Sequence, residues 1–136
     1  MTRQKGRNSS ASASRINRAF FTTASAGENI RLALDFKIST GCNSGVFIRT
    51  FPLRARPGKD VGFNGLEVAV DDTATAGYHD TGAIYDLSKP SQNAMKPAGQ
   101  WNHMTITCDR NLIEVELNGQ KVNRLDLDQW TAQFKF

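Results

Sequence analysis

An alternation of apolar and polar residues at positions 30–38 constrains the fold more than any other feature of this sequence. Apolar side chains occupy every second position, and Arg, Ala, Asp and Lys fill the positions between them. A period of two is that of a β-strand whose two faces meet different surroundings. The run therefore predicts a strand with one face on a hydrophobic core and the other partly in water.

Later segments repeat this alternation, and together they predict an all-β chain. They are residues 46–50, 65–72, 101–108 and 112–125. Because a turn is predicted at 40–45, the strands at 30–38 and 46–50 are expected to form an antiparallel pair. No helix of any length is predicted. Short strands joined by long loops, such as the Pro-, Arg- and Gly-rich stretch 51–64, predict a β-sandwich or jelly roll.

The last alternating segment folds about the Asn-Gly dipeptide at 118–119. This dipeptide favours a two-residue hairpin turn, because both positions accept positive φ. Such a turn would pair Val115 with Val122 and Glu116 with Lys121 across the two strands. The hairpin thus predicts one apolar and one oppositely charged cross-strand pair.

The 136 residues fit one domain, and their positive charges are unevenly placed. Five of the 17 Lys and Arg precede residue 19, where no acidic residue occurs, and the other 12 are balanced by 13 acidic residues. Residues 1–19 are therefore expected to be a disordered, basic, Ser/Ala-rich tail, and residues 20–136 the domain. A near-neutral body without a basic stripe argues against nucleic-acid binding, and no apolar segment is long enough to span a bilayer.

Cysteine usage and motif searches add little about compartment or metals. Cys42 and Cys108 lie far apart in the sequence, and no CxxC or HExxH spacing occurs. Cys108 falls on the apolar face of its segment, so a buried free thiol is expected there; Trp101 is also expected in the core. The tail lacks the apolar stretch of a secretory signal, which makes the cytoplasm the default expectation.

Two strands carry chemistry-bearing side chains on their polar faces. Phe47 and Arg49 follow a turn rich in Gly, Asn and Ser, and a stacking ring beside a guanidinium suits a flat, hydroxyl-bearing ligand. Glu67 and Asp71 share one face of the next strand with only Ala69 between them. Two carboxylates there suit a cleft better than a core, although both faces could be ordinary solvated strand surfaces.

Ordered sequence blocks across residues 28–130 resemble the 3-keto-disaccharide hydrolase domain family. The blocks are NSGVFIR at 43–49, GLEV at 65–68 with Asp71, GAIY at 82–85, KPAGQWN at 96–102, and the NG hairpin at 118–119. The resemblance implies a concanavalin A-like jelly roll with a carbohydrate site on its concave face. Family members usually have strands before residue 20 and after residue 136, so the domain is expected to be incomplete at both ends. They also often carry export signals to the periplasm.

The resemblance implies chemistry on glycosides already oxidised at C3. A ketone there acidifies the C2 proton, so a base can remove it and the group on C1 can leave by β-elimination, after which water can add. Arg49 would stabilise the enolate, and Glu67 and Asp71 would act as base or metal ligand. His79 would be a catalytic group, because an imidazole can accept and donate a proton. Further sugar-binding residues would be Asn43, Phe47, Tyr85 and Lys96.

Some alternatives stay open at this point. A divalent metal held by Glu67, Asp71 and His79 is neither required nor excluded, and His79 could be an ordinary loop residue. Retaining glycoside hydrolysis needs carboxylates about 5–5.5 Å apart, whereas Glu67 and Asp71 are roughly 13 Å apart along a strand. A lectin-like carbohydrate-binding module without chemistry is the alternative function, and it would bind a 3-keto-glucoside without turning it over. The sequence does not indicate the oligomeric state.

Overall fold

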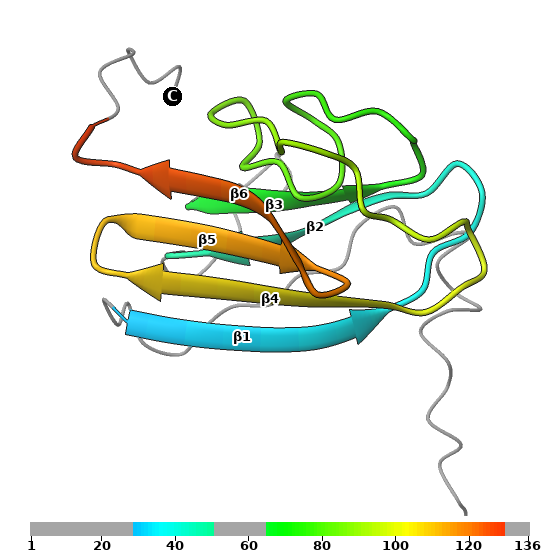
Figure 1. Ribbon diagram of the computed structural model, residues 1–136, viewed down its shortest axis with the longest axis horizontal. Helices are drawn as coiled ribbons and strands as arrows, with labels where there is room; N and C mark the ends of the chain where they lie inside the picture. The colour runs from blue at the N-terminus through cyan, green and yellow to red at the C-terminus, as the bar shows by residue number, and fades with distance from the viewer. Residues whose placement is uncertain (1–28, 51–64, 130–136) are drawn as a thin grey trace, which may run out of the picture.

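The computed structural model of the protein describes residues 29–50 and 65–129, and in these ranges it contains antiparallel β-strands and no helix. The strands are β1 (Asn29–Phe36), β2 (Asn43–Ile48), β3 (Leu66–Asp71), β4 (Asn102–Asp109), β5 (Leu112–Leu117) and β6 (Gln120–Asp126) (Figure 1). Each strand overlaps an alternating segment, so the predicted all-β class is confirmed, although β2 begins inside the turn predicted at 40–45. The predicted tail at 1–19 and the loop at 51–64 lie outside the described residues.

The strands form two sheets that face each other as a jelly-roll-type sandwich. One sheet has the order β1-β4-β5-β6, and the other joins β2 to β3; Figure 1 shows β2 and β3 behind the larger sheet. The expected pairing of 30–38 with 46–50 is wrong, because β1 pairs with β4 and β2 with β3. β1 and β2 each have one apolar face. The turn between β1 and β2 carries the chain from one sheet to the other, so that their apolar faces meet in the core.

The hydrophobic core lies between the sheets. Its fully buried members from both sheets include Ile48, Val68, Met104, Ile106, Val115 and Leu117. Burying an apolar side chain of this size contributes about 1.5–3 kcal/mol, so this shared interior holds the sandwich together. Cys42 and Cys108 are buried free thiols, as predicted for Cys108. Burial is the main reason that the pKa of each thiol is raised.

Trp101 does not lie in the core, and the expectation for it is wrong. Its side chain is 48% exposed, just before β4, and the Lys37 Nζ lies 5.1 Å from the centroid of its ring. The residue that follows it explains this. Asn102 points inward and is 1% exposed, and neighbouring side chains of a strand point to opposite faces. Trp101 therefore emerges on the outer face, where the Lys37 ammonium gains a cation–π contact.

The hairpin is present, with one irregularity in its register. Glu116 is opposite Lys121, as predicted, but Val115 is opposite Asn123 instead of Val122, so the predicted Val115–Val122 pair is wrong. A β-bulge between 115 and 116 shifts the register. Because of this bulge, the consecutive residues Val122 and Asn123 are both buried, and the side-chain amide of Asn123 lies at the edge of the core.

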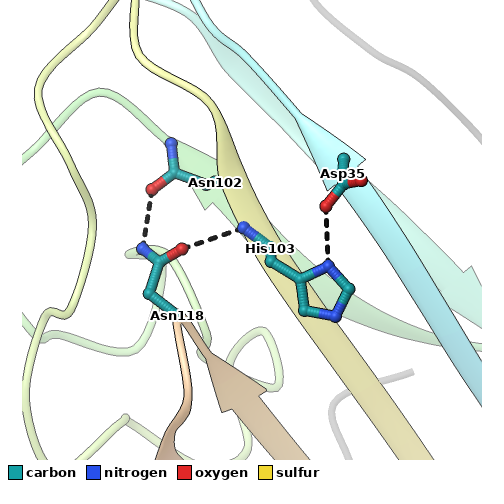
Figure 2. Close-up of polar contacts among 4 residues, drawn as sticks. All are labelled: Asp35, Asn102, His103 and Asn118. Carbon is teal, nitrogen blue, oxygen red and sulfur yellow. Dashed lines mark hydrogen bonds and ion pairs between the residues drawn. The ribbon is translucent and has the colours of Figure 1, made fainter.

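The side chain of Asn118 ties this hairpin to the start of β4, as Figure 2 shows, and also to the long loop that precedes β4. Its Nδ2 donates to the Ala94 carbonyl at 2.8 Å and to Asn102 Oδ1 at 2.9 Å, while its Oδ1 accepts the His103 N–H at 2.9 Å. His103 Nδ1 in turn lies 2.6 Å from Asp35 Oδ1 on β1. Asn118 has a φ of 50°, which Asn tolerates better than most residues. The turn residue therefore fixes the loop as well as reversing the chain.

Two loop segments run beside strands and complete the sheets' edges. Residues 81–85 lie along β3, with a bridge between Val68 and Ile84. Residues 88–91 lie along β6, where the Ser91 N–H donates to the Val122 carbonyl at 2.7 Å. The first of these segments brings residues of the 72–101 loop to the face that carries the predicted site.

Candidate functional site

The outer face of the smaller sheet carries half of the eight predicted site residues in cross-strand pairs. These pairs are Phe47–Glu67, Gly45–Ala69 and Asn43–Asp71. Since side chains alternate along a strand, the pairs point away from the core that Val46 and Val68 enter. Register alone therefore brings Phe47, Glu67, Asn43 and Asp71 to one face, as the alternation predicted for the two carboxylates.

Residues 81–85 extend each row of this face by one position. The Ala69 N–H donates to the Ala83 carbonyl at 2.9 Å, and the Tyr85 N–H donates to the Glu67 carbonyl at 2.8 Å. Tyr85, which is 39% exposed, is thus the neighbour of Glu67. An aromatic residue lies on either side of the Glu67 position, and the next row contains only glycine and alanine. Rings beside a small-residue floor suit a flat ligand.

Gly45 is required by the way Glu67 lies across the sheet. A Cβ at position 45 would be 2.2 Å from Glu67 Oε1 and 2.7 Å from its Cγ. The Glu67 side chain therefore covers the Gly45 backbone, and any larger residue would displace its carboxylate. The sequence suggests that Gly45 belongs to a turn. In the structure it is a residue of β2, and its lack of a side chain leaves room for the Glu67 carboxylate.

His79 joins the same neighbourhood through Tyr85 and Asp86. Its ring stacks on Tyr85 with centroids 4.3 Å apart and planes 13° apart. Its Nε2 lies 2.6 Å from Asp86 Oδ1. The backbone N–H of Asp86 donates a hydrogen bond of 3.2 Å to the Tyr78 carbonyl. If the Asp86 carboxylate accepts the proton of Nε2, the lone pair of the imidazole is on Nδ1. Figure 2 shows that the other histidine, His103, is bonded to Asp35, on the larger sheet.

Asp71 is on the same face, but its carboxylate organises the following loop. Its Oδ1 accepts the Thr81 N–H at 3.0 Å and also the hydroxyls of Thr81 and Thr73. Asp80 lies close by and accepts the Thr75 hydroxyl at 2.7 Å. Burial and the negative charge of Asp80 raise the pKa of Asp71, whereas the hydrogen bond from Thr75, ahead of smaller contributions, lowers the pKa of Asp80.

The structure does not bring the Arg49 guanidinium to this face. Arg49 follows the last residue of β2 with a φ of 54°, which breaks the alternation of the strand. Its guanidinium contacts Cys108, whose side chain belongs to the core between the sheets, and opposes the effect of burial on the pKa of that thiol. Its Nε and Nη2 are buried and have no hydrogen-bond partner among the described residues. The expected grouping of Arg49 with Glu67 and Asp71 is therefore not what the structure shows.

Asn43 and Lys96 lie at the margin of the site. Asn43 is exposed at the start of β2, opposite Asp71. Lys96 is exposed and lines a groove of about 340 Å³ together with Asp72 and Asn93. Its backbone N–H donates to Asn102 Oδ1 at 2.9 Å, which anchors the loop but leaves the ammonium on the surface.

The metal ligand set considered from the sequence is not assembled. In residues 29–50 and 65–129, no group of three or more His, Cys, Asp and Glu side chains could hold a metal ion. Glu67 and Asp71 are four residues apart on one strand, and Asp71 is bonded to threonines. No step of the chemistry below is assigned to a metal.

Asp86 is the site residue that sequence reasoning missed. Asp86 directly follows the GAIY block, and the sequence shows it only as an acidic residue seven positions after His79. In a regular helix or strand, residues seven positions apart are separated by about 10 Å or about 23 Å, too far for their side chains to form a hydrogen bond. Only the folded loop, with Asp86 at a φ of 62°, turns its carboxylate toward the imidazole.

These features define the protein as a β-sandwich with aromatic and carboxylate side chains together on one sheet face. The chain belongs to the 3-keto-α-glucoside-1,2-lyase-like domain family, whose sequence profile matches residues 4–135. The comparison with curated proteins found no match. Within the described residues, no helix is long and apolar enough to cross a membrane.

Two solved structures from Parabacteroides distasonis ATCC 8503 are similar to this chain, and both proteins are provisionally described as glycosyl hydrolases. One is 35% identical in sequence with a TM-score of 0.62. The other is 23% identical with a TM-score of 0.61, and this likeness concerns the fold alone. Each comparison covers 76% of this chain and 53% of the other chain, so this chain spans about half the length of these two proteins.

Proposed function

We propose that this domain cleaves 3-keto-glycosides by removing the C2 proton of the oxidised sugar and expelling the group on C1. Family membership supports the substrate class. One observation carries the assignment of the site: His79 stacks on Tyr85 and is bonded to Asp86, and Tyr85 is the backbone neighbour of Glu67. A base, an acid and a stacking ring therefore occupy one exposed face.

His79 is the proposed base. With its Nε2 proton donated to Asp86, its Nδ1 lone pair is free to take the proton from C2, whose acidity comes from the adjacent ketone. The electrons of the C2–H bond then form the C2=C3 double bond of an enolate. Asp86 stabilises the imidazolium that results, because its carboxylate is 2.6 Å from the ring.

Glu67 and the two aromatic residues beside it complete the elimination. As the C3 carbonyl re-forms, the enolate electrons make a C1=C2 double bond and the C1–O bond breaks, so the leaving oxygen needs a proton. Glu67 supplies this proton, and the rings of Tyr85 and Phe47 hold the sugar plane. His79 and Glu67 then return to their starting protonation states by exchange with solvent. The products are an unsaturated keto-sugar and the free alcohol; addition of water to the first completes hydrolysis.

Four predicted residues have different parts in this proposal. Asn43 and Lys96 are proposed to contact the sugar unit beyond the cleaved bond. Asp71 holds the loop that carries His79, and a role of Arg49 in enolate stabilisation stays a prediction. A direct contact of Arg49 with the substrate would require its guanidinium to leave Cys108.

Turnover of 3-keto-glucosides tests the proposal. The chain is incubated with a 3-keto-α-glucoside, and the released alcohol and the absorbance of the unsaturated ketone are followed. His79→Ala and Glu67→Gln are each expected to lower kcat by roughly 10²–10⁴-fold. Glu116→Gln removes an equal charge on the larger sheet and is expected to have no effect.

Two results would contradict the assignment. Unchanged turnover in His79→Ala and Glu67→Gln would remove these residues from the site. Saturable binding of the 3-keto-glucoside without any product, in the wild-type chain, would favour the lectin-like module instead.

A further inference from the structure

A second hollow, lined by none of the candidate-site residues, lies between loop 88–91 and the β5–β6 hairpin. Its volume is about 460 Å³, which falls within the range of about 300–1,000 Å³ typical of small-molecule sites. Its lining includes three basic side chains, Lys89, Lys121 and Arg124, with Glu114 as the acid among them. We call this hollow the basic groove.

The basic groove stands out against the charge of the surrounding protein. The described residues contain eight Lys and Arg against eleven Asp and Glu, and three of the eight basic residues line this one groove. Elsewhere in the described residues, five basic residues therefore face ten acidic ones. A local excess of positive charge on a net negative surface attracts anions.

Two of the three cations are not neutralised by neighbours. Lys121 Nζ lies 3.3 Å from Glu114 Oε2 and forms an ion pair. Lys89 and Arg124 have no ion-pair partner among the described residues, although Arg124 is opposite Glu114 in the strand register. An anion that enters the groove would therefore meet two cations with free hydrogen-bonding capacity.

The wall of the basic groove is fixed by the buried side chain of Asn123. Its Nδ2 donates to the carbonyls of Gly82 and Ser88 at 3.0 and 2.9 Å, and its Oδ1 accepts the Ser88 hydroxyl at 2.7 Å. The Ser91 N–H bonds the Val122 carbonyl. The loop that carries Lys89 is thus attached to the strand that carries Arg124, so the groove's shape does not have to be formed on binding.

We propose that the basic groove binds an anionic saccharide, one whose sugar units carry carboxylate or sulfate groups. The guanidinium of Arg124 can grip such a group with two hydrogen bonds, and Lys89 adds a point charge. The hydroxyls of Ser88 and Ser91 donate to Asn123 Oδ1 and to the Val122 carbonyl, so their oxygens can still accept hydrogen bonds from the sugar's own hydroxyls. The lining contains no aromatic residue on which nucleic-acid bases could stack, which favours a saccharide over a single-stranded nucleic acid.

Binding measurements with the full chain test this proposal. Calorimetry would use a uronate oligosaccharide, a sulfated oligosaccharide, a neutral glucose oligosaccharide and a single-stranded oligonucleotide. The wild-type chain is expected to bind at least one anionic saccharide and not the neutral one. The double variant Lys89→Gln/Arg124→Gln is expected to weaken that binding at least tenfold.

A charge-matched variant keeps the test specific. Arg31→Gln/Arg110→Gln removes the same two charges from other exposed positions and is expected to change Kd less than twofold. Equal weakening in both double variants, or no binding by the wild-type chain, would overturn the proposal. Binding of the oligonucleotide as tight as that of the saccharide would assign the groove to nucleic acid instead.

The proposed function can fail independently of this one. The choice of a saccharide as the ligand rests on the proposed function, whereas the expectation that the groove binds an anion rests on its lining residues alone. Turnover of a small neutral 3-keto-glucoside is expected to be the same in the wild-type chain and in Lys89→Gln/Arg124→Gln. Loss of turnover in that variant would mean that the groove belongs to the candidate site, and the proposal of a separate binding site would fall.

Discussion

Glu67 and Asp71 are both carboxylates on the outer face of β3, and their surroundings give them different tasks. Glu67 lies over a glycine beside two aromatic residues, whereas Asp71 is bonded to Thr81 and Thr73. Sequence alternation identifies their common face because the strand period is regular. It cannot distinguish their tasks, because these depend on a loop whose hydrogen bonds have no sequence period.

The pair Asp71 and Asp80 predicts opposite pH effects on stability. The pKa of Asp71 is raised in the folded protein, so its contribution is present at low pH and lost as pH rises through the raised pKa. The pKa of Asp80 is lowered, so its contribution is present above the unfolded value and lost as pH falls through the lowered pKa. Asp71→Asn is thus expected to be at least as stable as wild type at pH 7, and Asp80→Asn less stable.

Urea unfolding between pH 4 and 7 measures both variants. In the wild-type protein, ionisation of Asp71 should lower the free energy of unfolding as pH rises. This fall should be absent in Asp71→Asn, because the amide does not ionise, while its oxygen can still accept the hydrogen bond from Thr81. A stability profile of Asp71→Asn parallel to wild type across this range would show that ionisation of Asp71 is not penalised in the fold.

Gly45→Ala separates activity from stability. The added methyl meets the flexible end of Glu67, so the carboxylate should move aside with little loss of fold stability. If Glu67 supplies a proton in turnover, kcat should fall by about the same factor as in Glu67→Gln. The double variant should then be no worse than either single one, because both remove the same function. Additive losses would mean that Gly45 acts through something other than Glu67.

Arg49 is expected to affect stability more than turnover, because its guanidinium contacts Cys108 in the core between the sheets. Arg49→Ala leaves a cavity, and such losses typically cost about 2–5 kcal/mol for large buried side chains. Arg49→Met refills most of the volume and should be closer to wild type in urea unfolding. Loss of turnover in a fully folded Arg49→Met would instead support the enolate-stabilising role that the family resemblance implies.

Among the elements, the strands are predictable from sequence and their partners are not. All six strands of the described residues overlap alternating segments, but β1 and β2, which were expected to pair, lie in different sheets. Adjacent strands joined by a short turn often pair, and nothing local in residues 39–42 shows that this turn crosses between sheets. The bulge at 115–116 was likewise invisible, because either register leaves apolar residues facing the core.

The β5–β6 hairpin predicts an effect that reaches beyond its own turn. Asn118→Gly keeps the positive φ but loses the bond to Ala94 and the bonds to Asn102 and His103, of which Figure 2 shows the last two. Each net hydrogen bond is worth about 0.5–1.5 kcal/mol, so a loss of roughly 2–4 kcal/mol is expected in urea unfolding. Gly119→Asn, which also keeps a residue tolerant of positive φ but touches none of these partners, should cost much less. Equal losses in the two variants would show that the turn conformation, and not the clamp, is what matters.

At the scale of the whole molecule, the two buried thiols report on opening of the sandwich. Cys42 and Cys108 contribute side chains to the core, and the pKa of each is raised. Both should react with a thiol reagent far more slowly in the folded chain at pH 8 than in urea, because the thiolate is the reactive form. Fast reaction of one thiol in the native chain would identify a part of the sandwich that opens independently.

The segment 88–91 along β6 has a consequence for how the protein behaves in concentrated solution. A bare sheet margin can recruit a strand from another molecule and start aggregation. Here the Val122 carbonyl is already engaged by Ser91, and Asn123 fastens the covering loop. Variants that release this cover, such as Asn123→Ala, should therefore form fibrils or precipitate sooner even where most of the chain stays native.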